Sequence, residues 1–178
     1  KGLLVWTALT AQTEPEGLEL SRAGLRFAIG QSAAITGIAP VQDVPTTAAQ
    51  WVIWNASTTK SLVFEQLGAY LEGGVAGVGT KVVVAHFAAP ASVATRTGLT
   101  LVSMSNSTAT SAAFVNVSVT VTSPAAPGWF FIASDDSANT AIVNVAAMNN
   151  NVDGKIVVPP LRGLALAVLS PTGTSPLF

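Results

Sequence analysis

The chain contains no cysteine and only one histidine, His86, among its 178 residues. Without cysteine it cannot form disulfides, thiolate metal sites or iron–sulfur clusters. One imidazole cannot build a multi-histidine metal centre either. His86 is therefore the sole imidazole base that any Ser-His-Asp site in this chain can use.

Charge is scarce as well. Charged residues make up 10% of the chain, whereas roughly 25% is usual for a soluble domain. Eight basic and nine acidic residues leave a net charge of -1, which is too small to attract nucleic acid or an anionic membrane. The hydrophobic fraction is 49% and the mean hydropathy is +0.53. We expect a protein that removes much of its surface from water, with neither nucleic acid nor membrane as partner.

Long apolar runs are also missing. A membrane span needs about 18 apolar residues in a row, and the best candidates, residues 82–91 and 163–169, are too short. Residues 97–134 lack any charge, but their Ser, Thr, Asn and Pro content predicts strands and turns rather than a lipid-facing helix. The first residues show no apolar run or cleavage site of a secretory signal.

The dominant pattern that is present has period two. Between residues 114 and 122, valines alternate with Asn, Ser and Thr, which predicts a half-buried antiparallel strand. Its polar face carries no charge, so that face suits contact with another chain as well as with water. Further strands are predicted at 3–9, 18–29 with a break near Gly24, 51–55, 61–71, 81–87, 99–104, 129–133, 141–146, 155–158 and 164–169.

Turn residues separate these strands. Residues 56–59 predict a hairpin between the apolar runs 51–55 and 61–64, and the glycines of 73–79 predict a flexible loop able to adopt positive φ. Two further turns are predicted at 149–151 and at Asp153-Gly154, and Pro159-Pro160 should end a strand.

About ten strands without a long amphipathic helix predict an all-β fold. We expect one antiparallel β-sandwich domain over residues 1–178, with 1–17 as an extended arm or edge strand. A jelly roll is favoured over an up-and-down barrel, because its crossing connections accommodate the long segments 72–80 and 88–97. Within the second segment, residues 90–97 can form at most a turn of helix.

Candidate catalytic and metal-binding residues are isolated. His86 could serve as a base or lone metal ligand, but alternation places it with Val82 and Val84, which favours a packed, hydrogen-bonded strand histidine. Asp135-Asp136-Ser137 could hold Ca²⁺. However, adjacent side chains on an extended strand point in opposite directions, and an acidic turn explains the same residues.

No spacing selects a catalytic pair of carboxylates, and no serine lies in a Gly-x-Ser-x-Gly setting. The glycines of 73–79 lack the Lys-Ser or Lys-Thr pair of a phosphate loop. We therefore predict no enzyme activity, no cofactor, and no catalytic, cofactor-binding or metal-binding residue. The carboxylates available to a glycosidase-like pair are Asp43, Glu65, Glu72, Asp135, Asp136 and Asp153.

Two surface features have alternative readings. Asn55, Asn106 and Asn116 each begin a glycosylation tripeptide, which chance explains in a chain so rich in Asn, Ser and Thr. Aromatic side chains can form a sugar-stacking platform, the candidates being Trp129, Tyr70 and one of the strand tryptophans. Trp51 and Trp54 fall on opposite strand faces, so at least one is expected in the core.

The charge deficit itself carries information about partners. Charged side chains normally keep exposed strands from pairing with other chains. A sheet protein that lacks them is expected to cover its surfaces with copies of itself, because obligate interfaces resemble a domain core cut in half. We predict that the uncharged residues 97–134 contain the subunit contacts.

A resemblance fits this interpretation. Residues 51–64 (WVIWNASTTKSLVF), 68–71 (GAYL), 156–160 (IVVPP) and 163–168 (GLALAV) resemble structural proteins of tailed-bacteriophage virions. The resemblance implies a small jelly-roll domain that decorates or cements a capsid, often as a trimer, and it implies no active residue. We expect a self-associating virion protein whose partners are itself and capsid proteins. The alternatives are a carbohydrate-binding or adhesin-like module and, third, a hydrolase with a hidden carboxylate pair.

Overall fold

A computed structural model describes residues 20–28, 37–46, 48–71, 73–75, 77–88, 99–105, 108–120, 128–137 and 147–178. Most of these residues form antiparallel strands, which confirms the predicted all-β class. The chain divides into a small unit, residues 1–30 with 100–111, and a large unit, residues 31–99 with 112–178. The strands predicted at 3–9 and 141–146, and the helical turn at 90–97, lie outside the described residues.

In the small unit, the strand predicted over 18–29 is wrong in its first half. Residues 20–22 form a helical turn instead. Gly24 ends it at φ 67°, and the Leu25 N–H donates to the Leu20 carbonyl at 2.9 Å. This is the helix-ending arrangement that favours glycine, because the left-handed conformation has no steric cost without a Cβ. The break predicted near Gly24 is thus confirmed, and strand β1 (Phe27–Ala28) follows it and pairs with β7 (Val102–Ser103).

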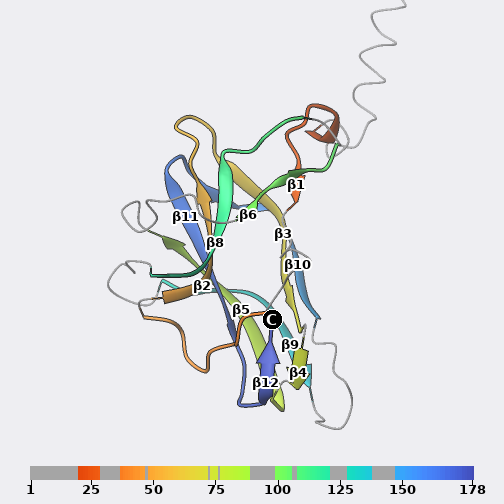
Figure 1. Cartoon of the computed structure of the whole chain (residues 1–178), viewed down its shortest axis with the longest axis vertical. Helices are drawn as coiled ribbons and strands as arrows, with labels where there is room; N and C mark the ends of the chain where they lie inside the picture. Colours follow the sequence, from red (N-terminus) through yellow and green to blue (C-terminus); the bar gives the residue numbers. More distant parts are fainter. Residues whose placement is uncertain are drawn as a thin grey trace, which may run out of the picture. The chain divides into compact units, whose positions relative to one another are not determined.

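The large unit is organised around one antiparallel sheet, visible in the centre of Figure 1. Its strand order is β6-β8-β2-β11-β5-β9, in which β6 (Leu99–Thr100) adds only two residues beside β8. The strands predicted at 51–55, 81–87, 114–122, 129–133 and 164–169 each overlap one of its long strands. The long strands are β2 (Ala48–Asn55), β5 (Gly79–Ala88), β8 (Ala113–Thr120), β9 (Phe130–Ser137) and β11 (Arg162–Leu169).

The centre of this sheet is buried on both faces. In the register, Val52 lies opposite Ala165, and the next row places Ile53 opposite Leu164. These two rows point to opposite faces, yet all four side chains are buried. Burial on both faces explains why β11 reads as a continuous apolar run rather than an alternating one.

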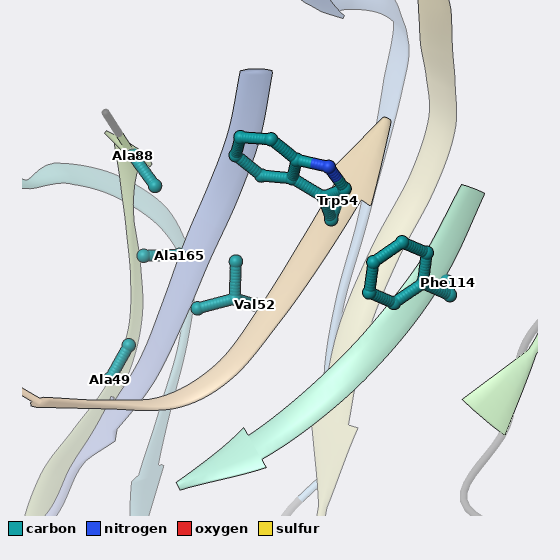
Figure 2. Close-up of a cluster of buried hydrophobic side chains, with 6 residues drawn as sticks. All are labelled: Ala49, Val52, Trp54, Ala88, Phe114 and Ala165. Carbon is teal, nitrogen blue, oxygen red and sulfur yellow. The ribbon is translucent and has the colours of Figure 1, made fainter. Parts of the chain in front are cut away.

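A cluster of buried side chains fills one face of the sheet (Figure 2). Trp54 packs there with Val52 and Phe114 among small side chains. Gly163 makes room for the indole, because a Cβ at Gly163 would lie 2.8 Å from Trp54 Cε3. Of the two strand tryptophans, Trp54 is therefore the core residue, whereas Trp51 is half-buried. The alanines of the cluster are Ala49, Ala88 and Ala165.

A two-stranded ribbon packs beside the sheet. Strand β3 (Leu62–Tyr70) pairs with β10 (Ala147–Val158), and β10 contacts β9, β5 and β11. The turn predicted at 149–151 is wrong, because these residues lie within β10 opposite 66–68. Cross-strand pairing with β3 decides their conformation, which local turn preference cannot foresee.

The turn predicted at Asp153-Gly154 is a bulge inside β10. Both residues have positive φ, 46° and 74°, as their types allow. Residues 152–155 together lie opposite Glu65 alone, between the pairs Asn151–Gln66 and Ile156–Phe64. The strand ends at Val158, before Pro159-Pro160, as predicted.

The hairpin predicted across residues 56–59 is also wrong. Strand β2 pairs with β8 and β11, whereas β3 pairs with β10, so this turn leads from the sheet to the ribbon. Asn55 organises it: its Nδ2 donates to the carbonyls of Lys60 at 2.8 Å and Val158 at 3.0 Å, and its Oδ1 accepts from the Ser57 N–H. The return connection, at Leu161, donates its N–H to the Asn55 carbonyl. The buried Asn55 thus holds in place both connections between the sheet and the ribbon.

The predicted flexible loop at 73–79 is largely ordered by pairing. Strand β4 (Gly73–Val75) pairs with β12 (Thr174–Leu177), a strand that the sequence reading missed. Positive φ is confirmed at Gly74 and Gly79, 71° and 120°. Nearby, Val41 forms a parallel bridge to Leu169 and so continues the sheet past the end of the β2 pairing.

Candidate interaction surfaces

His86 is a packed strand residue, as predicted from its alternation. It is 3% exposed, and its ring lies 5.3 Å from that of Trp129, centroid to centroid, at 52°. Gly128 closes over it, since a Cβ there would lie 2.4 Å from His86 Nε2. Among the described residues, His86 Nε2 has no hydrogen-bond partner, so the predicted hydrogen bonding is absent at this atom. No described carboxylate or serine hydroxyl forms a hydrogen bond with it, so the geometry gives no catalytic pair.

The acidic residues do not assemble into a site. Asp135 and Asp136 lie inside β9 rather than in a turn, opposite Lys81 and Thr80 respectively, so they point to opposite faces. Within the part of the chain that the structure describes, no group of three or more His, Cys, Asp or Glu side chains could hold a metal ion. The other candidates come from separate elements: Asp43 from 37–46, Glu65 from β3 and Asp153 from the β10 bulge, while Glu72 lies outside the described residues.

Two of the three glycosylation tripeptides begin with an asparagine that is buried in the folded chain. Asn55 is 3% and Asn116 is 7% exposed, and the Asn55 amide donates to two backbone carbonyls. A glycan on either amide would require the sheet to open. Asn106 lies outside the described residues.

Residues 97–134, where subunit contacts are predicted, include both buried and exposed side chains. In strand β8, Phe114 and Asn116 on the predicted polar face are buried, as is Val115 on the opposite one. The half-buried prediction is thus wrong for residues 114–116, which are buried on both faces of the strand. Elsewhere in 97–134, large apolar side chains are exposed, namely Val102, Met104 and Phe131.

Among the proposed stacking aromatics, Tyr70 is the exposed one. Its side chain is 57% exposed at the end of β3. Trp129 is half-buried, donates its Nε1–H to the Pro45 carbonyl at 3.0 Å and stacks against His86. Trp54 lies in the core. A planar ligand can therefore reach Tyr70 without rearrangement of the chain, but not the rings of Trp54 or Trp129.

Tyr70 belongs to a larger surface that the sequence reading did not find, which we name the outer ribbon face. It is the side of the β3–β10 ribbon opposite the buried residues Leu67 and Met148, between Tyr70 and the β10 bulge. The five residues assigned to it are exposed and none is charged. They are Gln66, Gly68 and Tyr70 of β3, and Asn149 and Asn151 of β10.

The register arranges this face in rows. Gln66 lies opposite Asn151, and Gly68 opposite Asn149. Beyond the bulge, Val63 and Val157 form an exposed apolar pair, 55% and 41% exposed. This pair lies on the other side of β3, because Val63 is an odd number of residues from Gln66. Gly68 keeps the strands close, because a Cβ there would lie 2.7 Å from the Met148 carbonyl oxygen. The alternation within 61–71 was the signal available in the sequence. However, the face appears only once β10 is known to be its partner.

Comparison with protein-family models, with curated proteins and with solved structures found no match to this chain. In the described part of the chain, no helix has both the length and the apolar character needed to cross a membrane. The function is therefore inferred from the surfaces of the described chain.

Proposed function

We propose that this chain is a virion structural protein that self-associates and docks on a phage capsid as a decoration, cement or related shell component. In this proposal its partners are copies of itself, with a trimer favoured, and other capsid proteins. The antiparallel, helix-poor architecture is compatible with such a role. The observation that carries the proposal is the outer ribbon face, an exposed and wholly uncharged strand surface of a kind that monomeric proteins normally protect with charge.

We also propose that the large unit is a jelly-roll-like sandwich, with the β3–β10 ribbon belonging to its second layer. Two observations support this arrangement. Strand β10 contacts three strands of the sheet, and the crossings held by Asn55 carry the chain from sheet to ribbon and back. Connections that switch between layers are typical of sandwiches.

The mechanism in this proposal is adhesive. Apolar and amide side chains become buried between copies, and each bound neighbour stabilises the folded chain by mass action. No covalent chemistry is required, and no described group of side chains provides it.

Native mass spectrometry between about 1 and 100 µM tests self-association, a range in which interfaces of ordinary affinity are occupied. Oligomers, with trimers prominent, are the expected result. Immunogold electron microscopy with an antibody against the chain tests shell docking, with gold on the particle surface expected. A monomer at every concentration together with unlabelled particles would overturn the proposal.

A carbohydrate-binding module is the second candidate, favoured by one specific observation. The exposed Tyr70 ring shares its face with the amides of Gln66 and Asn149. Aromatic stacking beside amide hydrogen bonds is chemistry that suits a neutral sugar. A glycan array with wild type and Y70A tests it: binding lost in Y70A supports this function, and no binding by the wild type rejects it.

A further inference from the structure

We propose that the open edge of strand β3 pairs antiparallel with the same edge of a second copy of this chain, about a two-fold axis. The two ribbons then form one continuous sheet in the order β10-β3-β3-β10. This inference rests on the proposed function, because it names the edge and the partner through which self-association occurs. In an assembly of trimers, such a contact joins one trimer to its neighbour.

The open edge is the first observation. Strand β3 is nine residues long, and within the described chain it is hydrogen-bonded to another strand on one side only, to β10. Along its other side, every second residue directs its N–H and C=O away from β10. Such a row of main-chain donors and acceptors is a template for another extended strand. Leu67 is the one buried residue of β3, so the strand is accessible along its length.

Two neighbouring strands have protected edges, whereas β3 does not. Strand β10 has positive φ at Asp153 and Gly154 of its bulge, where Asp153 and Lys155 add exposed charges. Strand β9, at the end of the large sheet, has a bulge at Ile132, whose carbonyl accepts from Asn150 Nδ2. Bulges and charges are the usual means by which strand edges avoid pairing between chains. Strand β3 contains no lysine, arginine or proline and no extra residue relative to β10.

Two-fold symmetry explains why the partner is a copy. Antiparallel pairing of β3 with β3 uses the same edge on both chains, so it occupies both open edges at once. Pairing of β3 with a different edge of a copy would leave one β3 edge open and allow open-ended growth. Glu65 is the one charged residue of β3, so the two edges repel each other little.

The register that pairs the full length of β3 places the axis at Gln66. Phe64 of one copy then lies opposite Gly68 of the other, and an aromatic side chain covers the space beside a glycine on the neighbouring strand. Each Glu65 lies opposite Leu67 of the other copy rather than opposite its counterpart. Like charges directly opposite each other, which destabilise a strand pair, are thereby avoided.

A cysteine at the axis tests the contact directly. The wild-type chain has no cysteine, so a disulfide in Gln66→Cys can form only between copies. Directly opposite residues of an antiparallel pair have Cα atoms about 4.5–5.5 Å apart, within the range of a disulfide. The full chain carrying Q66C, oxidised at a concentration where wild type assembles, should therefore run as a dimer on a non-reducing gel.

Asn149 supplies the matched control. It is exposed on the same ribbon face as Gln66, but it belongs to β10 and so lies one strand away from the contact. The full chain carrying N149C, oxidised in the same way, should remain a monomer on the gel.

Charge variants at Gln66 supply a second measurement, by sedimentation velocity. Q66K and Q66E each place like charges opposite each other across the axis, which should raise the dissociation constant at least about tenfold. An equimolar mixture of the two should restore association. Misfolded variants would not restore it, so recovery identifies a contact between copies. N149K and N149E should associate like wild type.

Two outcomes would overturn the inference in different ways. If the wild type assembles, but Q66C is cross-linked no more than N149C and Q66K and Q66E associate like wild type, the contact lies elsewhere and the proposed function still stands. If the wild type stays monomeric at about 100 µM, roughly the upper end for ordinary affinities, both the inference and the proposed self-association fail.

Discussion

The sheet centre and the outer ribbon face use the same kind of strand for opposite purposes. Both lack charge, but Val52 of β2 is buried whereas Tyr70 of β3 is exposed. In the sheet, neighbouring strands and covering segments remove the apolar side chains from water, which stabilises the fold. On the outer ribbon face, nothing in the described chain does so. The difference teaches that uncharged strands have two outcomes here: a core buried on two faces, and an exposed surface without charge.

The largest effect is expected in the sheet centre. Trp54→Ala should lower the free energy of unfolding by about 3–5 kcal/mol, because it empties the space above Gly163 and leaves Val52 and Phe114 without contacts. Urea denaturation measures it. Trp51→Ala, at a half-buried position on the opposite strand face, should cost clearly less, and equal losses would contradict the assignment of Trp54 to the core.

The second-largest loss of stability is expected at Asn55, where the chain passes from the sheet to the ribbon. Asn55→Ala should cost about 1–3 kcal/mol, because the buried Val158 carbonyl and the partly buried Lys60 carbonyl lose their donor. The same denaturation experiment measures this loss. Asn149→Ala on the outer ribbon face is the matched control, with a change within about 0.5 kcal/mol because its side chain is exposed. Similar losses for both would show that Asn55 does not clamp the crossings.

A smaller effect is expected where the ribbon strands approach most closely. Gly68→Ala should destabilise the chain by about 1 kcal/mol, since the new methyl would lie 2.7 Å from the Met148 carbonyl oxygen. Thermal unfolding followed by circular dichroism measures it. Gly73→Ala meets only Leu177 Cδ1 at 3.7 Å and serves as control; a larger loss at Gly73 than at Gly68 would refute the close approach.

The smallest effect on stability is expected at the exposed apolar row. Val63→Ser should change the free energy of unfolding by no more than about 0.5 kcal/mol, because Val63 is exposed in the single chain. Urea denaturation of the dilute chain should therefore match wild type. Large destabilisation of the diluted chain would mean that Val63 supports the fold itself.

The local sequence pattern was sufficient to predict where strands form, but not which strands pair with each other. Alternation and apolar runs located β5 and β11 within a few residues. The expected hairpin at 56–59 failed because a turn sequence does not reveal whether its flanking strands pair with each other or with strands a hundred residues away. In the sequence, Asn55 stands out only as the start of a chance glycosylation tripeptide, whereas its hydrogen bond to the Val158 carbonyl exists only in the folded chain.

The outer ribbon face could likewise be predicted only in part from the sequence. Scarce charge led to the expectation of uncovered, uncharged strand surface, and Tyr70 was named as an accessible aromatic. The rows of the outer ribbon face could not be foreseen, because Asn149 and Asn151 carry turn-forming side chains and became strand residues only by pairing with Gly68 and Gln66. The subunit contacts predicted within 97–134 remain a prediction at the exposed Val102, Met104 and Phe131.

By itself, the sequence determined the all-β class, the positions of most strands and the absence of a charged surface, because these follow from side-chain chemistry and period-two spacing along the chain. Only the tertiary structure decided which uncharged strands are core and which are surface. That choice depends on pairing between distant segments: residues 114–116 of β8 are buried on both faces, whereas the ribbon between Tyr70 and the β10 bulge buries Leu67 and Met148 on one side and exposes Gln66 and Asn149 on the other. Burial is a property of the assembled sheet, and no single strand carries it.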